Sequence, residues 1–489
     1  MNPIDIGTRR EPFWDTFLAD EEKTTACLRV NHPTFCDSLL ELGEEFDETC
    51  NEKMSISYPI LVRGEDTWRL YYHPCRTEEG WRARGGDFAQ MMLCVLESRD
   101  GISWKRPVLD NFKERYGRAT NIVFDELNDG IFIFYDENPA CPPEEKYKGL
   151  VCRVERKEDG KLIKRWLHCY TSADGLTFSE GYPIHYGYPV NDGAKYDSLN
   201  IPLWLGDRYI LYYRWYDETP ERSIRMVRYA YSEDFHTWHE GGTLSFHDEK
   251  IYQLYTNQVM RYERAPHMFI GLPTRYIERT AYTPNMEQMA AYPVKKAASD
   301  ENPPETLRSG LAVTDCLFMS SRDGENWNRF CEAFMTPGFE NPDNWVYGDC
   351  YPSYGFMDIG DENYYFFTID KHRTPDKPKP LHRWKIRKDG FAYFEADDDG
   401  AVFVTNPISF DGKKLHLNFE TSAAGSIYVD LLDADGNEIE GKTSFEIFGN
   451  AIDREVYFAD GSDFSEYAGK PVRLRFRMQD ARLYSMKFE

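Results

Sequence analysis

A seven-residue motif that repeats along the chain restricts its fold more than any other feature. Residues 98–104 read Ser-Arg-Asp-Gly-Ile-Ser-Trp, and similar motifs occupy residues 172–178, 232–238 and 321–327. Residues 389–393, Asp-Gly-Phe-Ala-Tyr, keep only the Asp-Gly pair and the aromatic residues. Each copy follows an apolar or alternating run. We therefore expect a strand that ends at Ser, a turn at Asp-Gly, and an aromatic residue that opens the next strand.

The spacing of the five copies indicates how these hairpins assemble. Successive copies are separated by roughly 60 to 90 residues, which is enough for one small antiparallel sheet each. Turn residues at Gly206-Asp207 and Gly360-Asp361 fall at similar places in their repeats. The sequence therefore predicts an all-β fold, with the sheets arranged as a five-bladed β-propeller.

The character of the chain changes after residue 398. Residues 399–489 contain neither Cys nor Trp, and apolar and polar residues alternate within 415–419, 427–431 and 472–477. This pattern predicts an antiparallel β-sandwich. We expect a propeller at residues 1–398 and a sandwich at residues 399–489. An N-terminal strand, at residues 13–18 or 27–30, is expected to close the ring of blades.

Charge and cysteine content limit the partners and the compartment. The formal net charge is −25, which argues against nucleic acid and against anionic membranes as partners. The first ten residues carry no apolar core of signal-peptide length, and no apolar run is long enough to span a membrane. The 11 cysteines include no Cys-x-x-Cys pair, so free thiols in a reducing cytoplasm are expected. No cofactor is expected, and the sequence assigns no metal ligand.

Propellers place functional side chains around the central axis, where the innermost strand of each blade begins. Asp197 and Asp349 are the leading catalytic candidates, because both stand at such starts among aromatic residues. The alternatives are a turn cap for Asp197 and a solvated loop residue for Asp349. Asp315, inside an apolar strand, is a third candidate, although an ion pair with Arg275 would also explain a carboxylate there. Glu48 is a fourth, in a run that solvation alone would explain.

A second group of polar and aromatic residues near the same strand starts is expected to bind substrate. For Arg275 the alternative is a core ion pair, and for His185 it is surface packing. The group consists of Tyr58, Asn121, His185, Asn200, Tyr255, Asn257, Arg275 and Trp345.

Three motifs connect the chain with known propellers. They are Asp197-Ser198-Leu199-Asn200, the pattern from Tyr255-Thr256 to Ala265-Pro266-His267, and the stretch from Gly469 to Phe476. With these motifs, the blade number and the trailing sandwich, the chain resembles the five-bladed β-propeller glycosidases. This clan includes arabinofuranosidases, xylosidases and fructosidases. The chain resembles most closely a group of bacterial glycosyl-hydrolase-like propellers with a C-terminal sandwich.

The resemblance implies a catalytic arrangement that this sequence matches only in part. In the clan, an Asp on the first blade acts as base or nucleophile, an Asp on the second tunes a pKa, and a Glu on the third is the acid. Here the second blade offers Asn121 and the third offers Asp197. Glycoside hydrolysis needs one protonated and one ionised carboxyl group across the bond that is cleaved.

The sequence therefore predicts a glycoside hydrolase that acts on a small oligosaccharide or glycoside in the central pocket. A catalytically silent carbohydrate-binding propeller is one alternative. A glycoside phosphorylase is another, with Arg275 and Arg118 available to hold phosphate. A carbohydrate is the expected small-molecule partner. Homo-oligomers could form through the sandwich or through the insertion at residues 278–308.

Overall fold

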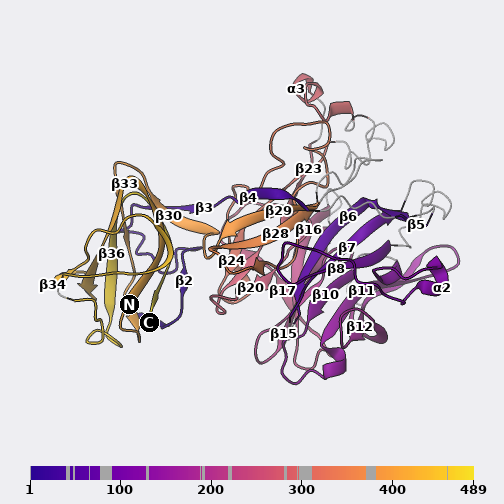
Figure 1. The fold of residues 1–489 in the computed structure, drawn as a ribbon, viewed down its shortest axis with the longest axis horizontal. Coiled ribbons are helices and arrows are strands. Elements are labelled where there is room, and N and C mark those ends of the chain that lie inside the picture. The colour runs from indigo at the N-terminus through magenta and orange to yellow at the C-terminus, as the bar shows by residue number, and fades with distance from the viewer. Residues whose placement is uncertain are drawn as a thin grey trace.

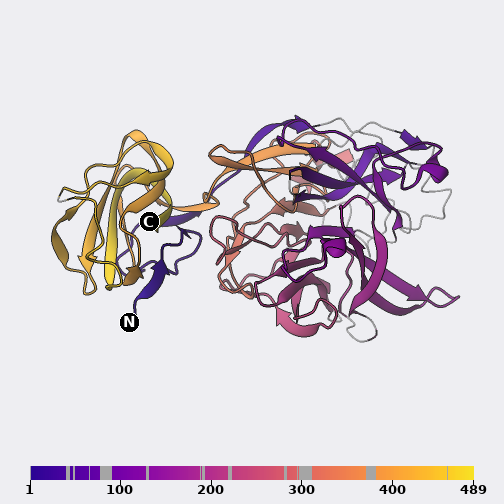
Figure 2. The same cartoon turned by 60° about the horizontal axis from the view of Figure 1, so that its bottom comes forward.

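The computed structural model describes most of the chain. The residues outside the description are 1, 40–44, 48–49, 65, 77–90, 128–130, 188, 190–192, 219–222, 280–282, 294–295, 297–310, 370–380 and 460. The described helices are short: α2 (Lys113–Tyr116), η1 (Pro143–Glu145) and α3 (Pro284–Glu287). The fold is all-β as predicted, with a β-propeller and a β-sandwich lying side by side (Figures 1 and 2).

The first two sheets of the propeller follow each other in the chain. The first contains β5 (Glu45–Asp47), β6 (Cys50–Arg63), β7 (Trp68–Arg76), β8 (Met91–Ser98) and β9 (Ile122–Leu127). The second contains β10 (Ile131–Tyr135), β11 (Tyr147–Arg156), β12 (Leu162–Ser172) and β13 (Ser179–Tyr186). One expectation was wrong here. Residues 121–124 were expected to open the second blade, but β9 pairs with β8 and completes the first sheet.

The third sheet is regular, whereas the next part of the ring is divided. The third sheet contains β14 (Ile201–Trp204), β15 (Tyr209–Glu218), β16 (Ser223–Ser232) and β17 (His239–Thr243). One short sheet then contains β19 (Gln253–Leu254), β22 (Thr274–Ile277) and β23 (Val313–Cys316). The other contains β18 (Ser245–Phe246), β25 (Asn326–Arg329), β24 (Met319–Ser321), β21 (Phe269–Gly271) and β20 (Met260–Arg261).

The last sheet of the propeller joins both parts of the chain. It contains β26 (Tyr351–Pro352), β27 (Met357–Asp358), β28 (Asn363–Ile369), β29 (Leu381–Arg387) and β4 (Thr34–Leu39). An N-terminal strand thus completes the last sheet, although the strand is β4 and not residues 13–18 or 27–30. If the two short sheets form one blade, the ring has the predicted five blades, and that count stays a prediction.

Four copies of the repeated motif form the same hydrogen-bonded turn. In the first copy the Ser98 hydroxyl donates to Asp100 and accepts from the Gly101 amide, while Asp100 accepts the amides of Ile102 and Ser103. The copies at Asp174, Asp234 and Asp323 repeat the aspartate contacts. These aspartates lie in the turns that follow strands, as the sequence predicted, and their carboxylates bind backbone amides of the same turns.

The fifth copy serves a different purpose. Asp389 is fully buried and has a positive φ of 59°. Its carboxylate accepts hydrogen bonds from Tyr262 at 2.7 Å, Arg264 at 2.8 Å and Ser485 at 3.0 Å, and lies 3.3 Å from an Arg10 guanidinium nitrogen. Because Arg10 and Ser485 belong to strand regions of the sandwich, Asp389 connects the propeller to the sandwich.

The sandwich sheet takes strands from both ends of the chain. Its C-terminal members are β31 (Ala401–Val404), β32 (Ile408–Phe410), β33 (Leu415–Asp433), β34 (Glu438–Thr443), β35 (Asn450–Glu455) and β36 (Val472–Phe488). The others are β1 (Ile4–Gly7), β2 (Glu11–Pro12), β3 (Cys27–Val30) and β30 (Ala392–Ala396). Strand pairing therefore crosses the expected division at residues 398 and 399, which stays a proposal.

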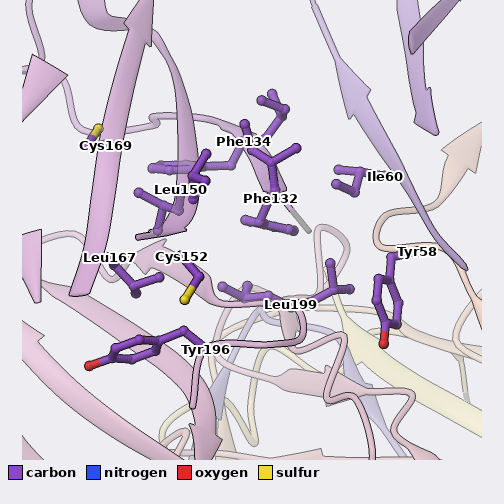
Figure 3. Close-up of a cluster of buried hydrophobic side chains, with 14 of the residues drawn as sticks. Tyr58, Ile60, Phe132, Phe134, Leu150, Cys152, Leu167, Cys169, Tyr196 and Leu199 are labelled. Carbon is purple, nitrogen blue, oxygen red and sulfur yellow. The ribbon is translucent and has the colours of Figure 1, made fainter. Parts of the chain in front are cut away.

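The centre of the propeller is filled by apolar side chains. Ile60 from β6 and Phe132 from β10 are almost completely buried, as is Leu199 just before β14. Figure 3 shows these side chains pointing toward one another, with Tyr58 beside them and Tyr196 at the edge of the group. A hollow of about 190 Å³ is lined by Glu137, Trp204, Arg261 and Tyr354, among others.

Candidate active site

Tyrosines from different sheets meet at the end of the ring where the inner strands begin. Tyr58 lies in β6, Tyr255 directly follows β19, and Tyr347 precedes β26. The Tyr347 hydroxyl donates a hydrogen bond to the Tyr255 hydroxyl, and their ring centroids are 5.5 Å apart. Tyr351 contacts both Tyr58 and Tyr255 at 5.6 Å between ring centroids. These rings form the wall of the candidate site.

Asp197 is the predicted catalytic residue that stands against this wall. Its Oδ1 accepts a hydrogen bond of 3.1 Å from Nη1 of Arg214, which lies in β15. The Asp197 side chain is 40% exposed, whereas that of Arg214 is 2% exposed. The ion pair therefore joins a buried cation to a carboxylate that solvent can reach.

Arg214 is fixed by more than its ion pair. It donates a hydrogen bond to the Tyr255 carbonyl, and its guanidinium lies 4.3 Å from the centroid of the Tyr255 ring. Burial alone would lower the pKa of Arg214, but Asp197 and the nearby tyrosines raise it well above its usual value. Arg214 is therefore a permanent positive charge that faces the Asp197 carboxylate.

A second buried arginine lies beyond Tyr255. Arg225, in β16, is 4% exposed and donates a hydrogen bond of 2.5 Å to Gln253. Its guanidinium lies 4.4 Å from the centroid of the Tyr276 ring and 5.4 Å from that of Tyr255. Its Nε has no hydrogen-bond partner, and no described carboxylate forms an ion pair with it. The faces of the Tyr276 and Tyr255 rings stabilise the buried positive charge of Arg225.

The tyrosine hydroxyls remain protonated at neutral pH. Burial, together with Tyr347, raises the pKa of Tyr255 to about 12. Burial also raises the pKa of Tyr58 well above its usual value. These side chains can therefore donate hydrogen bonds to a ligand without carrying charge.

Backbone strain is concentrated around this end of the ring. Of the eight described non-glycine residues with positive φ, five lie in or beside the inner-strand starts. Each left-handed residue costs roughly 1–2 kcal/mol, and such costs tend to collect at functional sites. The five are Tyr58, Tyr196, Gln258, Trp345 and Cys350. Tyr196 directly precedes Asp197 in the chain.

Asp349 lies near the same strand starts but has no exposed surface. Its Oδ2 accepts the amide of Val346 at 3.1 Å, and its carbonyl oxygen accepts the Thr314 hydroxyl at 2.7 Å. The carboxylate therefore closes its own turn. The structure brings Asp349 close to Tyr347 but does not direct it into solvent, in contrast to Asp197.

Asp315 forms an ion pair with Arg275, which was the alternative to a catalytic role for this residue. Arg275 and Asp315 face each other across β22 and β23, and two hydrogen bonds of 2.9 Å and 2.5 Å join them. Arg275 also donates to the Cys331 carbonyl at 3.0 Å. Both side chains are thus engaged in holding two strands and one loop together.

The three candidate asparagines are buried and bind the backbone. Asn121 donates to the Tyr72 hydroxyl and to the Val95 carbonyl, both at 2.9 Å. Asn200 donates to the carbonyls of Tyr196 and Ser198, at 3.1 Å and 2.9 Å, and so supports the turn that carries Asp197. Asn257 donates to the Leu199 carbonyl at 3.4 Å. Asn200 is therefore the one that positions the candidate site.

Two further candidates, His185 and Trp345, have partners within the scaffold. His185 is buried between Tyr196, at 2.6 Å from its Nδ1, and Glu240, at 3.0 Å from its Nε2. Trp345 donates its indole N–H to the Gly338 carbonyl at 2.8 Å. Glu48 lies outside the described residues, as do most of the residues in the 278–308 insertion.

Sequence reasoning missed Arg214, Arg225 and one acidic residue. Glu278, exposed just after β22, accepts the Tyr276 hydroxyl at 2.8 Å, and the Tyr276 ring packs 5.4 Å from that of Tyr347. The two arginines had a usable signal, because a cation inside an otherwise buried strand is costly unless it has a purpose. Glu278 gave no such signal, because an exposed acid at a loop is common.

Metal-ligand clusters and membrane-spanning helices were sought among the residues that the structure describes. No three His, Cys, Asp or Glu side chains among those residues gather as ligands for a metal ion. None of the described helices is both long and apolar enough to cross a bilayer.

No protein-family model and no curated protein matches the chain. Solved structures do resemble it. An N-acetylgalactosamine deacetylase from F. plautii is 11% identical with a TM-score of 0.48, covering 73% of this chain and 96% of its own. The Bombyx mori GH32 β-fructofuranosidase BmSUC1 is 8% identical with a TM-score of 0.41, covering 94% of each chain. Sucrose-6-phosphate hydrolase from Lactobacillus gasseri is 10% identical with a TM-score of 0.39, covering 90% of this chain and 93% of its own. At such low similarity, the activity of this chain has to be argued from its own residues.

Proposed function

We propose that the protein is a glycoside hydrolase that acts on a small oligosaccharide or glycoside at the tyrosine wall, with Asp197 as a catalytic carboxylate. One observation carries the proposal. Asp197 is 40% exposed and is held by a buried arginine. Because that arginine also packs on the Tyr255 ring, an exposed carboxylate and an aromatic side chain lie close to one fixed charge, a combination that suits a sugar site. The glycosidases among the structural neighbours are consistent with this function.

The surroundings of Asp197 favour the ionised role in hydrolysis. Because Asp197 forms an ion pair with Arg214, we assign it the role of the ionised carboxylate, either as a base toward water or as a nucleophile toward the anomeric carbon. The anomeric configuration of the first product, measured by NMR, distinguishes these two roles. Inversion indicates the base, and retention indicates the nucleophile.

Glu278 is our candidate for the protonated role. It is exposed, and its partner Tyr276 packs against the same tyrosine wall. Tyr276 can hold the Glu278 carboxyl group in one direction, as an acid that protonates a leaving group requires. Asp349 is less suited to this role, because its carboxylate is buried and bound to its own turn.

The experiment measures sugar release from a panel of aryl glycosides and small oligosaccharides. We expect Asp197→Asn to lower kcat/KM by about 10²- to 10⁴-fold in a protein that stays folded, although its melting temperature falls because the buried Arg214 loses its ion-pair partner. The matched control is Asp207→Asn, an exposed aspartate in the turn after β14, which should retain full activity. An active Asp197→Asn enzyme would remove Asp197 from the mechanism.

Glu278→Gln tests the acid by its dependence on the leaving group. We expect a loss of about 10²- to 10⁴-fold on oligosaccharides and a much smaller loss on aryl glycosides with acidic leaving groups, which depart without protonation. Equal losses on both substrates would contradict this role. Binding of glycans without release of sugar would instead favour the catalytically silent carbohydrate-binding propeller.

Arg225 favours a second candidate function, a glycoside phosphorylase. Phosphorolysis needs cations beside the catalytic carboxylate to hold phosphate. Arg275 is engaged by Asp315, whereas Arg214 binds Asp197 and both Arg214 and Arg225 lie against the Tyr255 ring. Arg225 has no described carboxylate partner. Activity that requires inorganic phosphate and yields a sugar phosphate would establish this alternative.

A further inference from the structure

Three large aromatic side chains are exposed together on the β-sandwich. Phe445, Phe448 and Tyr457 are each 60% exposed. They line one hollow of about 370 Å³, which is separate from the propeller site. Large apolar side chains that gather on a surface usually mark a binding site, whereas isolated ones need no explanation.

The backbone explains why these rings point outward. The Phe445 amide donates to the Tyr457 carbonyl at 2.9 Å, so the two segments run side by side as a ribbon. Between the exposed rings, Ile447 is 8% exposed and Val456 is 2% exposed. Residues in extended segments alternate between two faces. Each exposed ring directly follows a buried residue, Ser444, Ile447 or Val456, and therefore points to the opposite, outer face.

Charged groups border the rings and can form hydrogen bonds with a ligand. Glu446, Arg454 and Glu455 line the same hollow. Arg454 donates to the Phe448 carbonyl at 2.7 Å, and Glu455 pairs with Lys414 at 3.1 Å. The remaining donors and acceptors of these groups suit hydroxyl groups, and a carboxylate or guanidinium can bind two neighbouring hydroxyls.

We propose that this hollow is a carbohydrate-binding site for neutral sugar rings. Its volume lies within the range of roughly 300–1,000 Å³ that is usual for small ligands. The apolar faces of sugar rings can pack on the three aromatic rings, while the border groups bind the hydroxyls. The site is independent of the function proposed for the propeller.

The size and charge of the hollow disfavour other occupants. A standard protein interface takes about 20–30 residues from each partner, many more than line this hollow. An anionic membrane or an acidic polysaccharide would meet Glu446 and Glu455 on a chain of net charge −25. Neutral glycans avoid this repulsion.

The test is affinity electrophoresis of the full chain in gels that contain xylan, mannan or polygalacturonate. We expect at least one neutral polysaccharide to retard the protein and polygalacturonate not to do so. Phe445→Ala and Tyr457→Ala should each weaken the retarding interaction roughly 2- to 13-fold. Phe35→Ala is the matched control, because Phe35 is 48% exposed and lies in β4 of the propeller.

The proposal fails if no neutral polysaccharide retards the protein, or if the two variants and the control migrate alike. It also fails if sedimentation shows a dimer that the Phe445→Ala, Tyr457→Ala double variant converts to a monomer, because the rings would then form a subunit contact. If the double variant unfolds at the same temperature as the unchanged protein, a lost interaction with polysaccharide is due to the hollow and not to misfolding.

Discussion

Replacing Asp389 with Asn tests whether the fifth copy of the motif holds the two domains together. Asn has almost the same shape and tolerates positive φ, so the substitution keeps the backbone and removes the charge. Arg264 lies 2.8 Å from this carboxylate, and Arg10 lies 3.3 Å from it. Removing one partner of a buried ion pair costs about 3–5 kcal/mol. We take 4 kcal/mol as the expected loss.

Calorimetry converts this loss into a temperature. Unfolding entropy is about 2.1 cal/mol/K per residue, so cooperative unfolding of all 489 residues implies roughly 1 kcal/mol/K. The melting temperature would then fall by about 4 °C. A sandwich of roughly ninety residues that unfolds separately would lose about 20 °C. The size of the shift therefore reports whether the domains unfold together.

The control for this experiment is Asp398→Asn. Asp398 is exposed, and its carboxylate makes no hydrogen bond with a described residue. We expect no change in its melting temperature. If Asp389→Asn also melts within 1 °C of the unchanged protein, the carboxylate does not stabilise the junction and the reasoning is wrong.

Three further predictions follow from the contacts described. Trp327 is fully buried and follows the fourth turn motif, so Trp327→Ala should lower the free energy of unfolding by about 3–5 kcal/mol in urea titrations. Asp315→Asn should leave kcat/KM unchanged but lower stability, which kinetic and thermal measurements separate, because Arg275 holds this carboxylate in a strand contact. His267, Arg322 and Arg9 outweigh burial and lower the pKa of Glu11 from 4.5 to about 2. Stability from Glu11 is thus complete above pH 4.5 and is lost as the pH falls toward 2, by about 3 kcal/mol, measurable as a falling urea midpoint.

The sequence predicted local features of the fold better than the partners of each strand. The four Ser-x-Asp turns form as expected, because their hydrogen bonds involve only neighbouring residues. Residues 121–124 were assigned to the wrong sheet, since an apolar strand reads the same whichever neighbour it pairs with. Asp389 was interpreted only as part of a degenerate copy of the turn motif, because its partners Tyr262, Arg10 and Ser485 are far away in the sequence.

The candidate site divides in the same way. Asp197 could be selected from its place before an inner strand. Its geometry could not, because Arg214 reaches it from the second strand of the sheet. Asn121, Asn257 and His185 were expected to bind substrate, but each is used within the scaffold. A polar residue near the propeller axis can either bind substrate or support the scaffold, and only its hydrogen-bond partners show which of these roles it has.

The route of the chain between the two domains has a consequence for synthesis on the ribosome. The chain passes from the sandwich to the propeller through β3 and β4 and returns through β29 and β30, and Figures 1 and 2 show these passages beside each other. Strands β1 to β4 emerge first, but their partners lie beyond residue 380. At translation rates of about 5–20 residues per second, these strands wait roughly 17 to 95 s for their partners. During that interval their unpaired edges are exposed to chaperones and to other nascent chains.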